Sequence, residues 1–146
     1  MKANTLGKEY QDGDVIVRQG ESGEQIYVVQ EGQVEVVKER DGVNYQISVL
    51  GKGEFFGEMA VFERTERVAT VRALELARVL TIDKADFLRR VKEDPSLAFH
   101  LVETMSARIR KLDEDLVQLK NLLWDKGIPA DINSARVKDL FEKDKP

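Results

Sequence analysis

The sequence contains no cysteine and only one histidine among its 146 residues, which excludes most thiol and metal chemistry. Without cysteine there is no disulfide, no thiolate metal site and no cysteine nucleophile. His100 supplies a single imidazole, whereas a metal-dependent enzyme on a β-roll needs several clustered histidines. No nucleophile elbow is visible, and no histidine base lies near Ser22. We therefore expect no metal, no cofactor and no enzymatic activity.

Long apolar runs and an excess of positive charge are also missing. No apolar run approaches the ~20 residues that cross a bilayer, and Met1 to Asn4 lacks an apolar signal core. The formal net charge is −4, which argues against a large nucleic-acid surface. These absences predict a cytoplasmic protein with neither a membrane nor a nucleic-acid partner.

The first half of the chain has the pattern of short strands separated by glycine turns. Residues 43–49 alternate apolar and polar side chains, and Asp41-Gly42 is typical of a tight hairpin turn. Two further strands are predicted at 67–73 and 76–82. The pattern predicts a mainly β fold with flanking helices, built as a small roll or barrel.

The second half changes to a helical period. Asp83 is placed to cap a short helix that carries Phe87, Leu88 and Val91. Asp94-Pro95 then starts a long helix that ends at Lys126, before Gly127 and Pro129. At about 1.5 Å per residue this helix would span roughly 48 Å, more than the domain needs. We predict one domain over residues 1–126 and a tail, 127–146, with a short helix bearing Val137, Leu140 and Phe141.

Apolar residues recur along the long helix at spacings of three and four. The first turns are expected to pack against the roll. Beyond it, the spacing is close to a coiled-coil seam and predicts a homodimer. The seam consists of Leu112, Leu116, Leu119 and Leu123. The alternative is that the tail folds back over the same leucines within one chain.

A carboxylate, a turn of small residues and an arginine lie close together in Gly57-Glu58-Met59-Ala60 and, nine residues after Glu58, Arg67. The first N–H groups of a helical turn at Glu58 attract an anion, and a guanidinium suits a phosphate. Glu58 has no favourable role towards an anion, so a sugar hydroxyl is its natural partner. The combination describes a ribose phosphate. The alternative is a structural Glu58–Arg67 ion pair, which contributes only about 0–1 kcal/mol at a surface.

The segments 56–60 and 67–71 resemble the phosphate-binding cassette of cyclic nucleotide-binding domains, of the catabolite activator and protein kinase A regulatory subunit type. Segments 13–16, 19–24, 26–29, 32–36 and 50–53 agree in order and spacing, so the resemblance covers about residues 6 to 125. It implies a double-stranded β-helix, a jelly-roll-like β-roll, followed by a long C-terminal helix, as in a stand-alone bacterial form. It also implies the ligand-binding residues, which are Gly57, Glu58, Met59, Ala60, Arg67 and Val68.

Two departures from the family pattern bear on the ligand. Glu66 stands where the family often has proline, and Val68 stands where members that favour cyclic GMP often carry threonine. Val68 therefore favours cyclic AMP, although a valine cannot by itself reject guanine. The resemblance also implies that the long helix covers the base with Arg108, Leu112 and Asp113.

The sequence predicts one function and leaves two alternatives. The first is a cyclic nucleotide sensor that prefers cyclic AMP and acts on an unidentified protein effector. The second is the regulatory part of a catabolite-activator-type transcription regulator, although only about twenty residues follow Lys126, too few for a helix-turn-helix domain. The third is a dimerisation scaffold that no longer binds the nucleotide.

Overall fold

The computed structural model describes residues 7–128, which form six strands and three helices. The chain divides into two compact units, Met1–Ala98 and Phe99–Pro146. The strands are β1 (Lys8–Tyr10), β2 (Val15–Val17), β3 (Gln25–Arg40), β4 (Val43–Leu50), β5 (Phe55–Phe56) and β6 (Thr70–Asp83). The helices are α1 (Glu58–Glu63), α2 (Lys84–Glu93) and α3 (Ser96–Asp125).

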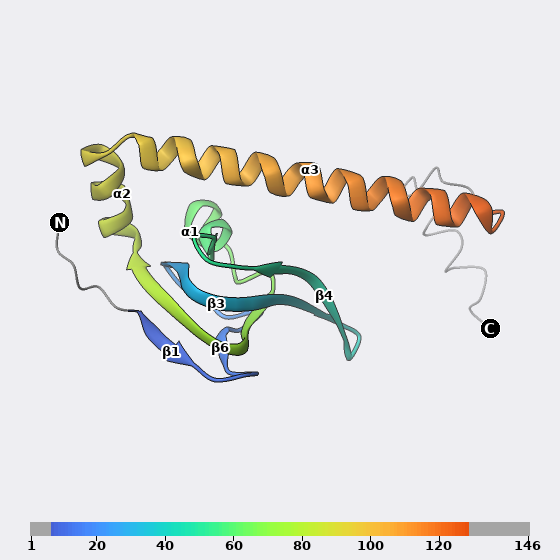
Figure 1. Cartoon of the computed structure of the whole chain (residues 1–146), viewed down its shortest axis with the longest axis horizontal. Coiled ribbons are helices and arrows are strands. Elements are labelled where there is room, and N and C mark those ends of the chain that lie inside the picture. The colour runs from blue at the N-terminus through green and yellow to red at the C-terminus, as the bar shows by residue number, and fades with distance from the viewer. Residues whose placement is uncertain (1–6, 129–146) are drawn as a thin grey trace. The chain divides into compact units, whose positions relative to one another are not determined.

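The first unit is an antiparallel sheet organised around its two longest strands, β3 and β6. The strand order is β1-β6-β3-β4 (Figure 1). In addition, β2 pairs with β6 and β5 pairs with β3. Valine, alanine and aromatic side chains from these strands form the core, and Val29, Val34 and Val79 are almost completely buried. The predicted mainly β roll with flanking helices and a long C-terminal helix is confirmed.

Both long strands bend at the same level of the sheet, where Gly32 of β3 approaches β6. Gly32 has a φ of +75°, and a Cβ there would lie 2.2 Å from the carbonyl oxygen of Leu76. Glu75 of β6 also has a positive φ, 54°, and the β3–β6 register shifts nearby. The prediction of separate strands at 67–73 and 76–82 was therefore wrong. One strand, Thr70–Asp83, passes through the bend, and Arg67 precedes it.

The β3–β4 hairpin has the predicted turn, because Asp41 and Gly42 both have positive φ, as a two-residue type I′ turn requires. The alternation over residues 43–49 correctly predicted a strand. It does not correspond to a buried face, since Val43, Tyr45, Ile47 and Val49 are each 41–52% exposed. The register shift between Val36 and Val37 leaves Ile47 as an extra residue in β4, which breaks the alternation between the two faces.

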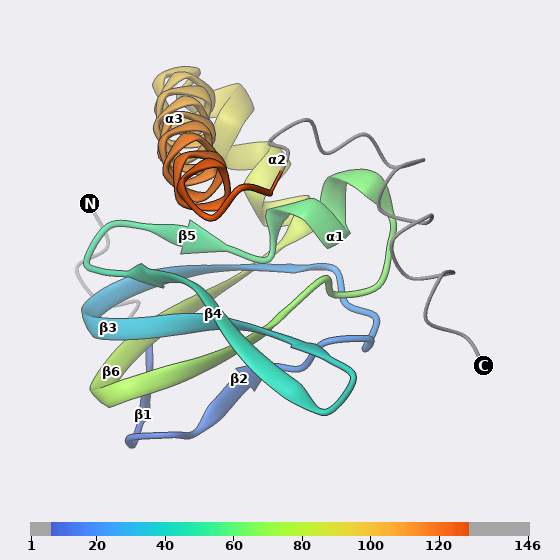
Figure 2. The same cartoon turned by 90° about the vertical axis from the view of Figure 1, so that its right-hand side faces the viewer.

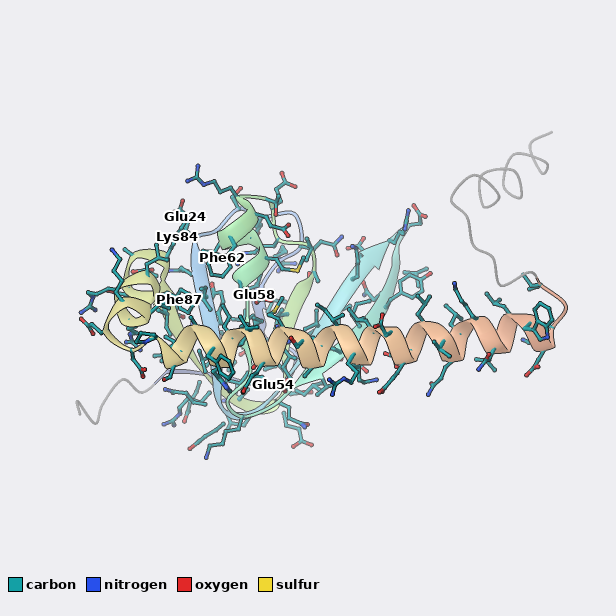
Figure 3. All side chains as sticks on the ribbon, turned by 90° about the horizontal axis from the view of Figure 1, so that it is seen from above. Glu24, Glu54, Glu58, Phe62, Lys84 and Phe87 are labelled. Carbon is teal, nitrogen blue, oxygen red and sulfur yellow. The ribbon has the colours of Figure 1, made fainter. Side chains whose placement is uncertain are left out.

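Helix α2 starts at the predicted position, but Asp83 does not cap it with its side chain. That carboxylate instead accepts a hydrogen bond from the Gln25 side-chain amide at 3.3 Å. Phe87 of α2 is buried, and its ring meets Phe62 of α1 edge to face, with ring centres 5.9 Å apart. Figure 3 shows these two rings side by side. The contact ties α2 to the helix that carries Glu58.

Helix α3 has 30 residues, a length of about 45 Å. Asp94 begins it by accepting hydrogen bonds from the Ser96 N–H and hydroxyl, at 3.1 and 2.6 Å. At the other end, Gly127 has a φ of +73°, and the N–H of Ile128 bonds to the Leu123 carbonyl at 2.9 Å. With the Gly127 to Trp124 bond, this is a Schellman motif. No α3 side chain is buried.

None of the helices in the described residues is long and apolar enough to cross a membrane.

Candidate functional site

Helix α1 begins immediately after Gly57, whose φ of +87° and ψ of −3° place it in the left-handed region. A side chain there would be strained, so glycine sets the angle at which the chain enters α1. Glu58 occupies the first turn and is only 7% exposed. The first N–H groups of α1 have no partner within the helix, and their dipoles favour negative charge. Figure 2 shows α1 following directly from β5.

Arg67 is buried, and backbone carbonyl groups fix its guanidinium. Nη1 donates to the carbonyl oxygen of Gly57 at 2.8 Å, and Nη2 donates to that of Gln25 at 3.1 Å. The backbone of Arg67 also pairs with the β2–β3 loop, because its N–H bonds to the Glu21 carbonyl at 2.8 Å. A guanidinium carries five N–H donors in a fixed plane. The two carbonyl contacts therefore orient the group without using all of its donors.

Two glycines leave the space that this guanidinium occupies. A Cβ on Gly23 would lie 2.4 Å from Nη2 of Arg67, and a Cβ on Gly57 would lie 2.8 Å from Nη1. At distances this short the Cβ and the guanidinium nitrogen would overlap, so one of the two would have to move. Gly57 therefore has two roles, because it turns the chain into α1 and admits the arginine.

The aromatic ring of Tyr27, on β3, packs against the guanidinium of Arg67. The guanidinium carbon lies 5.8 Å from the centre of the Tyr27 ring, within the range of a cation–π contact. The ring stacks on Phe56 at 5.0 Å, and its hydroxyl donates to the Gln25 side chain at 3.2 Å. Burial raises the pKa of Tyr27 above its ordinary value, while the nearby Arg67 charge opposes that rise. Tyr27 therefore contacts the cation as a neutral phenol.

The predicted cassette residues lie at the start of α1 and just before β6, and the hydrogen bond from Arg67 to the Gly57 carbonyl joins these two places. Glu58, Ala60 and Arg67 are buried, whereas Met59 and Val68 are 41% and 44% exposed. Arg108, Leu112 and Asp113 lie on α3, in the second unit, so their role against the base stays a prediction. Among residues 7–128 no group of three or more histidine, aspartate or glutamate side chains is arranged to hold a metal ion.

A hollow of about 360 Å³ borders the cassette between the β2–β3 loop, the end of α1 and the start of α2. Of the predicted ligand-binding residues only Ala60 lines it. Neither Glu58 nor Arg67 lines the hollow, which therefore lies beside the predicted site. Its lining consists of Ser22, Gly23, Glu24, Ala60, Val61, Arg64, Thr65, Glu66 and Lys84. Figure 3 shows Glu24 and Lys84 close together, and the Lys84 N–H bonds to the Glu24 carbonyl at 3.1 Å.

Gly23, Gln25 and Tyr27 support the site, but no role for them was predicted from the sequence. Gly23 belongs to the turn-rich segment 19–24, and Tyr27 to the strand that follows, so both read as structural. Nothing in the sequence indicates that the Gln25 carbonyl accepts from a residue 42 positions later. Only the pairing of the β2–β3 loop with Arg67 reveals the connection.

The comparisons with known proteins agree on one family. The family described as "Cyclic nucleotide-binding domain" matches residues 7–94. A cAMP-dependent protein kinase regulatory subunit from Schizosaccharomyces pombe is 42% identical over 80 residues, covering 55% of this chain and 19% of that protein. The cyclic AMP receptor protein of Thermus thermophilus is 32% identical over 108 residues, covering 73% of this chain and 50% of the relative.

Among solved structures, the Thermus thermophilus catabolite activator protein superposes with a TM-score of 0.67 and 31% identity, covering 77% of this chain and 53% of that one. The chain thus spans about a fifth to a half of the length of these relatives. The family match includes α1, Glu58 and Arg67 and covers more than half of the sequence. The chain therefore belongs to the cyclic nucleotide-binding domain family.

Proposed function

We propose that this chain binds a cyclic nucleotide, prefers cyclic AMP, and acts as a non-catalytic sensor module in the cytoplasm. The observation that carries the proposal is the buried guanidinium of Arg67, which two carbonyl groups orient beside the first turn of α1. A buried cation beside the start of a helix is a favourable place for a singly charged cyclic phosphate.

Each cassette residue has a distinct role in this proposal. Arg67 binds the exocyclic phosphate oxygens, and the backbone N–H groups of Ala60 and Val68 add neutral donors. Glu58 accepts a hydrogen bond from the ribose 2′-hydroxyl. Gly57 supplies the turn and the space for Arg67, and Met59 borders the ligand.

Isothermal titration calorimetry of the full chain with cyclic AMP, cyclic GMP and 5′-AMP tests the proposal. We expect saturable binding of cyclic AMP and weaker binding of cyclic GMP. The linear 5′-AMP should bind far less well, because its phosphate is differently charged and is not held against the ribose. No heat of binding with either cyclic nucleotide would overturn the proposal and favour the scaffold function.

The preference for cyclic AMP rests on Val68, which lacks a hydroxyl. We expect Val68→Thr to raise the affinity for cyclic GMP more than that for cyclic AMP, since a new hydroxyl can pair with the guanine edge. One EAL enzyme related to this chain at 28% identity has been solved with cyclic AMP and, separately, with cyclic GMP. That pair supports a cassette whose fold accepts either base, so selectivity must come from individual side chains.

Homodimerisation through α3 is the second part of the proposal. Leu112, Leu116 and Leu119 are each about half exposed in the single chain. They continue to Leu123 at heptad spacing, the pattern of a two-stranded coiled coil. In such a dimer, an effector protein would meet two copies of the sensor, each with or without bound ligand.

A further inference from the structure

Arg67, the proposed phosphate ligand, lies in a segment that belongs to no strand or helix, because α1 ends at Glu63 and β6 begins at Thr70. Both backbone groups of Arg67 bond instead to the β2–β3 loop. The Gly20 N–H donates to the Arg67 carbonyl at 2.8 Å, and the Arg67 N–H donates to the Glu21 carbonyl at 2.8 Å. The position of Arg67 therefore depends on what fixes this loop.

Gln19 connects the loop to the β3–β4 hairpin through its side-chain amide. The amide oxygen accepts a hydrogen bond from the Glu39 N–H at 2.8 Å, and the amide nitrogen donates to the Glu39 carbonyl at 3.0 Å. Val37 and Thr70 are the last paired residues of the β3–β6 ladder, so Glu39 lies beyond the start of β6. The Gln19 side chain thus pairs with the backbone of Glu39 where β6 provides no partner.

A third hydrogen bond joins Gln19 to the start of β6. Its backbone N–H donates to Oγ1 of Thr70 at 3.0 Å, and Thr70 follows Arg67 by three residues. We propose that Gln19 is a positioning residue, which acts through the loop and Thr70 to hold Arg67 in the geometry that binds the phosphate. This inference rests on the proposed function, because it assigns how the phosphate-binding arginine of that site is held.

The chemistry of Gln19 suits this role better than a role in overall stability. Its two side-chain bonds to Glu39 are exposed, so they contribute little to the stability of the core. Their main effect is on local opening of the loop. A loop that is already ordered before the ligand arrives lowers the entropy cost of binding. Loosening it should therefore weaken the ligand more than it weakens the fold.

Amide hydrogen exchange of the free protein, followed by NMR, tests the positioning without any ligand. In Gln19→Ala we expect about tenfold faster exchange of the Gly20 and Arg67 N–H groups, because the loop opens more often. The N–H of Val79, a buried residue of β6, should exchange at its wild-type rate. Gln33→Ala is the matched control, because Gln33 is an exposed glutamine of β3 whose side chain bonds to none of the described residues.

Titration calorimetry with cyclic AMP measures the consequence for the ligand. We expect Gln19→Ala to bind roughly tenfold more weakly than wild type. Thr70→Val keeps the shape of the side chain and removes only the Oγ1 acceptor, so a smaller loss of about threefold is expected. Gln33→Ala should keep the wild-type affinity. Circular dichroism and the urea midpoint check that each variant folds.

Unchanged exchange of the Gly20 and Arg67 N–H groups in Gln19→Ala would overturn the proposal. So would faster exchange with a cyclic AMP affinity within twofold of wild type, because Gln19 would then serve only the fold. If Gln19→Ala does not fold, the same two measurements on Thr70→Val decide the question. A wild-type chain that binds no cyclic nucleotide would overturn the proposed function instead, and the exchange rates would still decide whether Gln19 holds Arg67.

Discussion

The roll and the long helix use their apolar residues in opposite ways. In the roll, valines and aromatics are buried, and three charged residues, Glu35, Glu58 and Arg67, are buried with them. In α3 no side chain is buried, although leucines recur along its length. The buried guanidinium suits the binding of an anion, whereas the regular stripe of exposed leucines suits association with another helix. Apart from Leu112, which is predicted both to cover the base and to join the seam, ligand recognition and assembly should therefore respond to different substitutions.

The largest expected effect is on assembly. Leu116→Ala combined with Leu119→Ala should dissociate the dimer, because each buried leucine contributes about 1.5–3 kcal/mol to the interface. Analytical ultracentrifugation at tens of micromolar would measure the change. Val117→Ala is the matched control, because this residue is equally apolar and exposed but lies off the seam. A wild-type chain that sediments as a monomer would contradict the predicted seam.

The next effect concerns the ligand and should leave assembly intact. Arg67→Ala should weaken cyclic AMP binding by about 2–5 kcal/mol, or about 30- to 5,000-fold, because the phosphate loses its charged partner. Titration calorimetry measures the loss, and circular dichroism checks the fold. Arg64→Ala is the control, since Arg64 is an exposed arginine at the end of α1. Affinity within threefold of wild type for Arg67→Ala would remove Arg67 from the site.

A smaller effect is expected for Glu58, and it distinguishes recognition of the ribose from recognition of the phosphate within the same cassette. Glu58→Gln should weaken cyclic AMP by about 1.5–3 kcal/mol, the range for a hydrogen bond to a charged group. The same substitution should change the affinity for 2′-deoxy cyclic AMP much less, because that ligand lacks the hydroxyl. Equal losses for the two ligands would show that Glu58 acts on the fold or on the phosphate rather than on the ribose.

The smallest effect concerns the third buried charge, Glu35, which has no role in the proposed site. Its carboxylate accepts hydrogen bonds from the Arg72 guanidinium and, at 2.7 Å, from the Gln46 amide. These hydrogen bonds lower the pKa of Glu35 below its ordinary value. Their stabilisation is therefore fully present above the pKa of the unfolded chain and is lost as pH falls through the folded pKa.

Urea unfolding at pH about 6 and about 3 would show this loss. We expect wild type to lose about 1 kcal/mol more than Glu35→Gln between the two conditions, because the amide does not titrate. Glu39→Gln, on the same strand and exposed, is the control. An equal pH dependence in wild type and Glu35→Gln would mean that the Arg72 contact does not depend on the charge of Glu35.

The sequence predicted those features that depend on neighbours along the chain. The hairpin turn at Asp41-Gly42, the glycine before α1 and the stop at Gly127 are local, and each was found at the predicted residue. The continuous strand through Glu75 was missed, because the close approach of β6 at Leu76 requires a glycine, Gly32, on another strand. The support of Arg67 by Gly23, Gln25 and Tyr27 was missed for the same reason, since strand pairing alone brings them together.

The pairing of β3 with β6 has a consequence for how the protein reaches this structure. Gln25 and Asp83 lie 58 positions apart and meet at the end of a long ladder. Bringing together residues so far apart in the sequence costs conformational entropy before the stabilising contacts form. Sheets of this kind therefore typically fold in milliseconds to seconds. Helix α3 contains only local hydrogen bonds and can form on the scale of about a microsecond. We therefore expect Arg67 to reach its position only in the slow step, when β3 has paired with β6.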